Sequence, residues 1–393
     1  MNKRKFYYIL FVVSVFLISC SSSNYLYRII FWNYSGIDDC NRFPSRLIQS
    51  SDKPFYFDSN SDVINKYKSV FDSISYSYKG KIFTKDIDAL IAETQTTAFI
   101  VIKDDCIIIE KYANGYSRDS VNRSFSVAKS ITSALIGIAI DKRFIKSIDE
   151  SICDYLTELD KKKYGSIQIK HLLSMQSGIK FSANGLPLCD DVHLYYEPDA
   201  RNYALSHLKI IGKPGEKFLY NNYCTLLLAI ILERASKMSI TEFTQKYLWS
   251  AIGTEYQATW SINRKNDGLE QVASGFNARA IDFAKIGRLY LKEGNFEGTQ
   301  VLVSDWINQS IKPPALPDDY FANSEMGKNI FYGYQWWGHH LANNNYNFFA
   351  SGHLGQLIYV CPSKKIIICR FGKRRGNIDV GWHIIARWIC DRM

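Results

Sequence analysis

Apolar positions form strand-like runs near both ends of the 393-residue chain and follow helical spacing in between. Residues 97–116 contain two apolar runs joined by Lys-Asp-Asp, and residues 355–372 contain two more around Pro-Ser-Lys. Short apolar runs separated by polar turn residues are typical of β-hairpins. Residues 379–393 have the spacing of an amphipathic helix. We therefore expect one hairpin from each end of the domain and a helix after the second.

The stretch from about residue 150 to 310 has mostly helical apolar spacing, with Gly or polar clusters where each helix would end. This order predicts the α/β (α+β) class: an antiparallel sheet of N- and C-terminal strands flanked by helices, with an inserted helical lobe. Residues 86–393 would form this single domain. Residues 21–85, which are polar and aromatic, would form a tether and an N-terminal extension. A cleft between sheet and lobe is the expected site.

The first 20 residues have the pattern of an export signal. A Lys-Arg-Lys triplet precedes an apolar run over residues 6–18, which is short for a membrane span but suits a signal-peptide core. The run leads into Leu-Ile-Ser-Cys, which resembles a bacterial lipobox, so Cys20 is the predicted lipidation site. We expect a lipid-anchored protein of the bacterial cell envelope, facing the periplasm or in the outer membrane. An uncleaved membrane anchor is the alternative, and both interpretations place the domain outside the cytoplasm.

Composition changes this picture little. Hydrophobic residues make up 47% of the chain and charged residues 22%, as in ordinary globular domains. The formal net charge of +10 is not gathered in a long basic run, so no nucleic-acid partner is predicted. The eight cysteines after Cys20 include no C-x-x-C pair and suggest no disulfide pairing. The pair His339-His340 lacks ligand spacing, so we expect surface histidines there, and neither a metal nor a cofactor.

Candidate chemistry lies at the start of the most apolar helical pattern, residues 127–140. Ser126 and Lys129 are three positions apart, which places both side chains on one face of the first turn. A buried lysine is costly unless it is paired or used, and a serine beside an amine base is what a nucleophile needs. The same spacing recurs in polar, helix-end or surface-helix contexts, where it is interpreted as chance: Ser50/Lys53, Ser177/Lys180 and Ser206/Lys209.

The segment from Ser126 to Lys129 resembles the first signature, Ser-x-x-Lys, of the serine β-lactamase and penicillin-binding-protein superfamily. Further stretches resemble its class C β-lactamase-like branch, closest to the 6-aminohexanoate-dimer hydrolases and related serine esterases: residues 167–179, 214–240, 275–294 and 332–337. The resemblance covers about residues 85–390. It implies the β-lactamase/transpeptidase-like fold and serine catalysis without a cofactor.

The second signature of that branch, Tyr-x-Asn, corresponds to the segment from Tyr220 to Asn222. The resemblance implies that Tyr220 passes protons between the serine and the leaving group. A phenol beside an ammonium favours its anion, which would suit such a relay. Asn222 would orient Lys129 or the substrate. A second Tyr-x-Asn begins at Tyr112, on the first predicted hairpin, where a plain strand residue is the simpler interpretation.

The third signature, Lys-Thr-Gly on a strand beside the cleft, corresponds to His353-Leu-Gly355. Gly355 would let the substrate lie against the strand, and the N–H groups of Gln356 and Ser126 would form an oxyanion hole. The change from Lys to His removes a permanent cation that holds the carboxylate of β-lactams and peptidoglycan peptides. Asp191 lies in a loop where amide-hydrolysing relatives carry substrate-contacting acids, and it is included on the resemblance alone.

These residues predict a serine hydrolase that forms an acyl-enzyme on a carboxylic ester or amide. Ser126 would attack the carbonyl, Lys129 would accept the proton and Tyr220 would deliver it. A β-lactamase or D-alanyl-D-alanine carboxypeptidase is the first alternative, and a non-catalytic penicillin-binding-like envelope protein is the second. The expected partners are a small ester or amide substrate and, through the lipid, a membrane. The sequence leaves the natural substrate and the oligomeric state open.

Overall fold

One antiparallel sheet joins the two ends of the domain in the computed structural model, which describes residues 7, 24–183, 185, 189–314 and 329–393. The C-terminal strand β15 pairs with the N-terminal strand β4, with Ile367 opposite Ile102. The expectation that the two hairpins share a sheet is thereby confirmed. The strand order is β11 (Ile330–Tyr332), β12 (Trp337–His340), β13 (Tyr346–Gly352), β14 (Gln356–Cys361), β15 (Ile366–Gly372), β4 (Thr96–Lys103) and β5 (Cys106–Tyr112).

Helices cover both faces of this sheet, which explains why its central strands are apolar throughout rather than alternating. Helix α13 (Ala280–Leu291) packs on one face, where a Cβ on Gly287 would lie 2.8 Å from Ile367 and 3.1 Å from Ile358. Helix α15 (Trp382–Arg392) packs on the other face, where the His383 ring stacks on Phe349. Every residue of β14 is buried between these helices.

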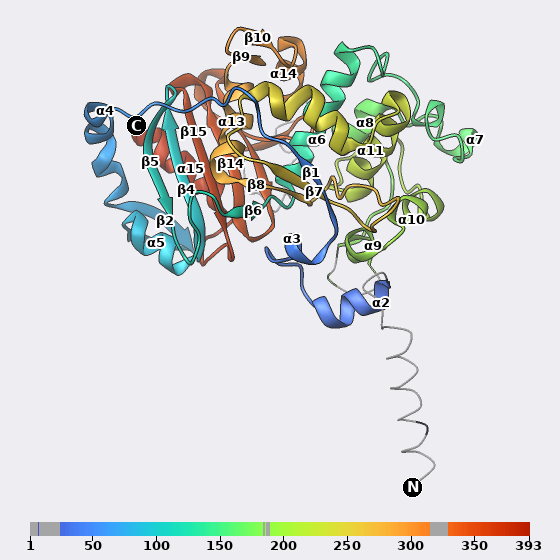
Figure 1. The fold of residues 1–393 in the computed structure, drawn as a ribbon, viewed down its shortest axis with the longest axis horizontal. Coiled ribbons are helices and arrows are strands. Elements are labelled where there is room, and N and C mark those ends of the chain that lie inside the picture. The colour runs from blue at the N-terminus through green and yellow to red at the C-terminus, as the bar shows by residue number, and fades with distance from the viewer. Residues whose placement is uncertain (1–6, 8–23, 184, 186–188, 315–328) are drawn as a thin grey trace.

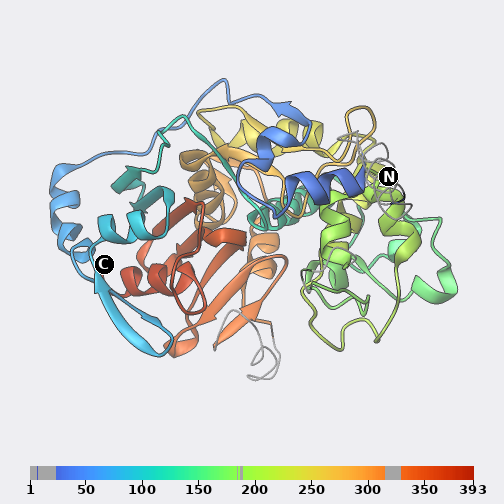
Figure 2. The same cartoon turned by 90° about the horizontal axis from the view of Figure 1, so that it is seen from below.

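The helical lobe lies beside the sheet and is built around the buried helix α11 (Asn222–Ser236) (Figures 1 and 2). Helix α13 was predicted within the lobe, whose expected limits were about residues 150–310, but it lies on the sheet. Helical periodicity reports an apolar face and not which body that face meets. The other lobe helices are α7 (Lys161–Tyr164), α8 (Ile169–Leu173), α9 (Asp190–Tyr196), α10 (Ala200–His207) and α12 (Ile240–Thr244).

Helix α6 (Val127–Asp141) runs between the sheet and the lobe and contacts both β13 and α11. Gln335 joins these parts, because its side chain donates to the carbonyls of Leu172 and Leu173 and accepts from Thr225. Its own carbonyl accepts a hydrogen bond from Ser130 of α6. Through its side chain and its backbone carbonyl, Gln335 therefore links the β11–β12 connection with three helices.

A second antiparallel sheet of order β1–β7–β8–β6 was not predicted, because its strands are only three or four residues long. It is formed by β1 (Ser45–Ile48), β7 (Ala258–Ser261), β8 (Phe276–Arg279) and β6 (Val121–Arg123). Strand β6 leads directly into Ser126. No helix of the described residues is long and apolar enough to span a membrane. The predicted signal segment and Cys20 lie outside the described residues.

The remaining α-helices and strands of the described residues lie around these two sheets. They are α2 (Tyr25–Tyr27), α3 (Asp39–Arg42), α4 (Ser61–Tyr67), β2 (Ile74–Tyr78), β3 (Lys81–Lys85), α5 (Ile87–Glu93), β9 (Asn295–Phe296), β10 (Thr299–Gln300) and α14 (Ser304–Ile311).

Candidate active site

Ser126 stands at the turn between strand β6 and helix α6. The preceding residue, Phe125, has a φ of 44°, a left-handed conformation that bulky residues rarely adopt. Strain of this kind persists where surrounding structure holds it, and it often occurs at functional sites. The hydrogen bond from the Ala128 N–H to the Phe125 carbonyl starts the helix immediately afterwards. This turn could not be predicted from the sequence, because Phe has no preference for a positive φ.

Lys129 is buried on the first turn of α6, where its Nζ lies 2.9 Å from Ser126 Oγ. Nζ also donates to the carbonyl of Ala273 at 3.1 Å and lies 4.9 Å from the centre of the Tyr220 ring. Burial lowers the pKa of Lys129 to about 7, and the negative charge of Asp191 opposes part of this shift. The lysine is therefore available as a neutral amine near neutral pH.

Tyr220 lies just before α11 and completes a cluster with Ser126 and Lys129. Its ring stacks on Trp337, with centroids 5.7 Å apart, and meets Tyr332 edge-on at 6.1 Å. Burial raises the pKa of Tyr220 well above its usual value, and a hydrogen bond with Ser126 opposes the rise only in part. Tyr220 is therefore a neutral phenol here. This corrects the expectation of a favoured anion, because desolvation outweighs the nearby amine.

Asn222 and Asp191 form the lobe side of the site. The Asn222 side-chain amide donates to Asp191 Oδ1 at 2.5 Å. Among the described residues no group hydrogen-bonds the buried Asn222 Oδ1, so this acceptor is free for another partner. Asp191 lies close enough to Lys129 and His353 for its charge to raise both pKa values. Asn222 was expected to orient Lys129 or the substrate, and its observed partner is Asp191.

The strand end nearest the Ser126 backbone is that of β13, at Gly352. A Cβ built on Gly352 would lie 3.1 Å from the Ser126 nitrogen and 2.5 Å from the Ser124 carbonyl oxygen. Gln356, the predicted oxyanion-hole partner, pairs with Gly352 from the next strand. Its side chain is buried and hydrogen-bonds the His353 carbonyl and both backbone groups of Gly372. The backbone beside the Ser126 N–H is therefore that of Gly352, and the prediction of Gln356 is corrected.

His353 begins the turn that follows β13, and its ring meets the Phe125 ring edge-on at 5.2 Å. The ring reaches solvent, yet partial desolvation lowers the pKa of His353; Asp191 opposes this shift and Arg375 adds to it. The imidazole is therefore neutral at neutral pH.

Gly355 ends the same turn with a φ of 84°. A Cβ there would lie 2.8 Å from Arg370 and from Trp382, on the side of α15. Gly355 therefore serves the turn and the packing beneath it, and the expectation that it lines the substrate path is corrected.

The side chains of the rival motifs have other partners. The Tyr112 hydroxyl donates to Glu110 on the same strand. Ser206 Oγ bonds the Asn202 carbonyl of its own helix, and buried Ser177 accepts from the Ile179 N–H. Within the described residues, Ser126–Lys129 is the only one of the four pairs with a hydrogen bond between the two side chains.

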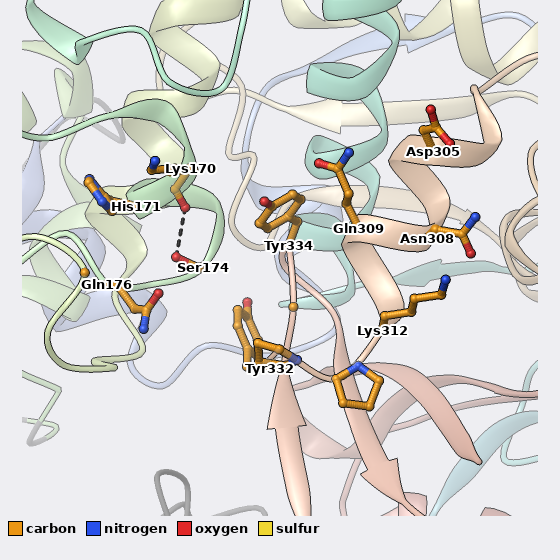
Figure 3. Close-up of a pocket in the computed structure, with 14 residues that line it drawn as sticks. Lys170, His171, Ser174, Gln176, Asp305, Asn308, Gln309, Lys312, Tyr332 and Tyr334 are labelled. Carbon is orange, nitrogen blue, oxygen red and sulfur yellow. Dashed lines mark hydrogen bonds between the residues drawn. The ribbon is translucent and has the colours of Figure 1, made fainter. Parts of the chain in front are cut away.

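A cavity of about 610 Å³ lies between α8 and α14 and is not lined by Ser126 or Lys129 (Figure 3). Tyr332 and Tyr334 lie on its sheet side, and His171 and Lys312 face it from the two helices. Because Tyr332 packs against Tyr220, the aromatic cluster separates this cavity from the nucleophile. We assign the chemistry to the Ser126 cluster, because the cavity's Ser174 donates to the Lys170 carbonyl and its His171 accepts from the Gln168 N–H, so they do not form a nucleophile–base pair.

No cluster of three or more metal-ligating side chains occurs in the part of the chain that the structure describes. His339, expected at the surface, is buried and shares a hydrogen bond with His383 at 2.9 Å. Its neighbour His340 is exposed, as expected. The error has a simple cause: β12 is covered on the face that His339 occupies, and sequence spacing does not report that cover.

The chain is similar in sequence and in fold to known proteins. The chain is 24% identical over 312 residues to the 6-aminohexanoate-dimer hydrolase of Paenarthrobacter ureafaciens, covering 76% of this chain and 78% of that protein. A Bacillus anthracis structure provisionally named a 6-aminohexanoate-dimer hydrolase superimposes with a TM-score of 0.72 at 23% identity, covering 89% and 90% of the two chains. A penicillin-binding protein of Bacillus halodurans gives 0.61 at 14% identity, covering 78% and 99%. The family model described as Beta-lactamase matches residues 83–380, and the chain therefore belongs to the β-lactamase family.

Proposed function

We propose that the chain is a serine hydrolase that cleaves a carboxylic ester or a linear amide through an acyl-enzyme on Ser126. The observation that carries this proposal is the 2.9 Å contact between Lys129 Nζ and Ser126 Oγ. The pKa of that lysine is lowered to about 7, so a large fraction of it is a neutral amine at neutral pH. A general base works best with a pKa near the working pH.

The reaction follows from the positions of three groups. Neutral Lys129 accepts the Ser126 proton while Oγ attacks the substrate carbonyl, and the N–H of Ser126 stabilises the oxyanion. Tyr220, held as a neutral phenol, donates its proton to the leaving alcohol or amine and regains one from Lys129. Water then attacks the carbonyl of the acyl-enzyme. The same groups take the proton of the water and return one to Ser126 Oγ, which releases the acid and restores Ser126.

The charges around the cluster favour some substrates over others. The His353 ring lies against Phe125 beside the nucleophile, and its lowered pKa leaves this imidazole neutral, so it offers no fixed charge to a β-lactam carboxylate. Asp191 and Asn222 offer oxygen acceptors beside the cluster. An ester, or a linear amide with an amino group as in the 6-aminohexanoate dimer named for the relatives, fits this arrangement better than a β-lactam does.

The test is hydrolysis of short p-nitrophenyl esters, amino-terminated linear amides and nitrocefin by wild type and Ser126→Ala. We expect measurable ester or amide turnover that exceeds nitrocefin turnover. Ser126→Ala should lose about 10³-fold or more of kcat/KM, because only binding and the oxyanion site remain. Ser206→Ala is the matched control and should keep the wild-type rate, since that hydroxyl bonds its own exposed helix.

Two results would reject the proposal. One is an unchanged rate in Ser126→Ala. The other is a wild-type protein that a fluorophosphonate probe and a fluorescent penicillin both fail to label, which would indicate a protein that only binds. Faster hydrolysis of nitrocefin than of every ester and amide would instead favour a β-lactamase.

We also propose that the protein is exported and lipid-anchored through Cys20. The basic start, the apolar run over residues 6–18 and the lipobox-like ending support this proposal. Cys20→Ser should abolish incorporation of labelled palmitate. Continued labelling of the Cys20→Ser protein would reject the lipidation site.

A further inference from the structure

Residues 25–32 form two helical turns whose polarity is inverted relative to an ordinary surface helix. The charged residue is on the inner face: Arg28 is 2% exposed and donates to the carbonyls of Tyr196 and Asn263. The Trp32 ring lies 5.2 Å from the Arg28 guanidinium on the same inner face. A surface helix normally directs its charge to solvent and its apolar side chains to the core.

The outer face carries the apolar side chains. Leu26, Ile30 and Phe31 are 47%, 53% and 50% exposed, and Tyr34 just beyond the helix is 84% exposed. Leu26 and Ile30 are one helical turn apart, so they form a continuous strip rather than scattered contacts. A contiguous exposed apolar strip next to polar surface marks a contact with a partner or a membrane.

The segment that precedes this helix in the sequence indicates whether a partner or a membrane covers the strip. Lipidation at Cys20 would put a lipid anchor five residues before Tyr25, so at about 3.5 Å per residue the helix starts within about 18 Å of it. The exposed strip also carries the aromatic side chains of Phe31 and Tyr34, and Tyr in particular is enriched at membrane–water interfaces. We propose that residues 25–34 are a membrane-contact helix whose exposed strip lies in the lipid headgroup region, an inference that rests on the proposed anchoring of the N-terminal segment.

This helix is fixed to the wall of the active site. The Tyr25 ring stacks on His193 of α9, with centroids 4.3 Å apart, and Arg28 bonds the carbonyl at the end of the same helix. Helix α9 begins with Asp190 and Asp191, and Asp191 faces the Ser126 cluster. Figure 1 shows α2 directly next to α9. The contact helix therefore holds the acidic wall of the cleft close to the membrane surface, where substrates that partition into lipid would be concentrated.

The experiment places a fluorophore on the strip of the full-length protein. In a Cys40→Ser background, Ile30→Cys is labelled with an environment-sensitive nitrobenzoxadiazole dye and reconstituted into vesicles of phosphatidylethanolamine and phosphatidylglycerol. Ile82→Cys is the matched control, since Ile82 is also an exposed isoleucine (80%) but lies on the β2–β3 hairpin at the other side of the molecule (Figure 2). The Cys40→Ser parent measures background labelling, and ester hydrolysis checks that each labelled protein is folded.

The dye at position 30 should lose most of its fluorescence when nitroxide-labelled lipid is included, because interfacial helices sit about 5–10 Å into the headgroup and acyl boundary. The dye at position 82 should be unaffected. If the protein floats with the vesicles but neither dye is quenched, the lipid anchor is supported and the membrane-contact helix is rejected. If the protein does not float, the lipid anchor and the membrane-contact helix are both rejected. If the dye at position 30 in detergent becomes shielded from solvent as the protein concentration rises, a second copy of the chain covers the strip. This result would also reject the inference.

Discussion

Burial sets the chemistry of the individual residues at this site. Lys129 is buried without a carboxylate bonded to its Nζ, and its pKa falls to about 7. Burial moves the pKa of Tyr220 upward instead, so the same desolvation yields a base and an acid a few ångströms apart. The sequence identified both residues, but the protonation state of Tyr220 followed only from its enclosure by Trp337 and Tyr332.

The pH dependence of the reaction tests the role of Lys129. Below its pKa the lysine is a cation and accepts no proton, so kcat/KM should rise with pH and level off above about pH 7. At one pH unit below that pKa the rate should be about tenfold lower than the plateau. The measurement is a profile of ester hydrolysis from acidic to weakly alkaline pH.

Two variants identify the group that titrates. Asp191 raises the pKa of Lys129, so Asp191→Asn should move the inflection to lower pH. His353→Gln should leave the inflection in place. Loss of the inflection in His353→Gln would contradict the assignment to Lys129.

At the scale of elements, the site depends on how closely β13 approaches the start of α6. The end of β13 passes so near that Gly352 has no room for a Cβ beside Ser124 and Ser126. Buried Arg370 on β15 holds the turn after β13 in place. Its guanidinium donates to the Leu354 carbonyl of that turn at 2.6 Å and to the Thr94 carbonyl at 3.0 Å. Strand, turn and helix therefore define the space in which a substrate carbonyl would lie.

Replacing Gly352 tests this approach. In Gly352→Ala the new methyl group would lie 2.5 Å from a backbone oxygen, so β13 must shift away from Ser126. Because oxyanion stabilisation depends on donor distances of about 2.7–3.1 Å, we expect kcat to fall by about tenfold or more. Gly212→Ala is the matched control, since nothing lies within 4 Å of a Cβ at that position. Equal kcat values for the two variants in ester hydrolysis would contradict the close approach.

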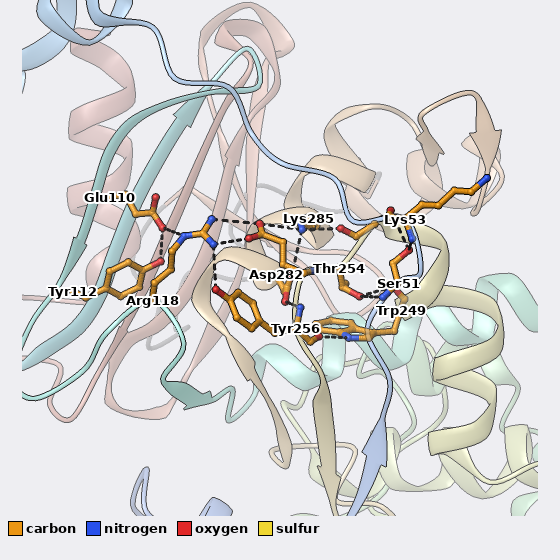
Figure 4. A network of polar contacts seen from close by, with 12 residues as sticks. Ser51, Lys53, Glu110, Tyr112, Arg118, Trp249, Thr254, Tyr256, Asp282 and Lys285 are labelled. Carbon is orange, nitrogen blue, oxygen red and sulfur yellow. Dashed lines mark hydrogen bonds and ion pairs between the residues drawn. The ribbon is translucent and has the colours of Figure 1, made fainter.

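At the scale of the whole molecule, a buried ion network connects the sheet, the loop before β6 and helix α13 (Figure 4). Arg118 bonds Glu110 on β5 and Glu255 in the loop before β7. Lys285 of α13 lies 3.0 Å from Asp282 and 3.2 Å from Glu255, and its side chain is fully buried. Segments from distant parts of the chain are thus held together by charges, of which Lys285, Asp282 and Glu255 have little access to water.

Removal of one charge should therefore be costly. Lys285→Met leaves Asp282 and Glu255 buried without their shared cation, and we expect a loss of about 3–5 kcal/mol in the free energy of unfolding. Lys292→Met, at the C-terminal cap of the same helix, is the control, because the Lys292–Asp105 pair is partly exposed and should contribute about 1 kcal/mol or less. Urea unfolding of both variants gives the comparison. Similar stabilities for Lys285→Met and wild type would show that the network is dispensable.

The apolar runs predicted the fold class, and the resemblance of several stretches besides Ser-x-x-Lys predicted the family; both are confirmed. Both hairpins, the helix at Ser126 and the final helix depend on patterns within about twenty residues, which the sequence displays directly. Tertiary structure decided what depends on contacts between distant segments. It placed α13 on the sheet, buried His339, set Gly352 rather than Gln356 beside the Ser126 backbone, and made Tyr220 a neutral phenol. Local pattern reports which face of an element is apolar, whereas desolvation and close approach depend on which other element covers that face.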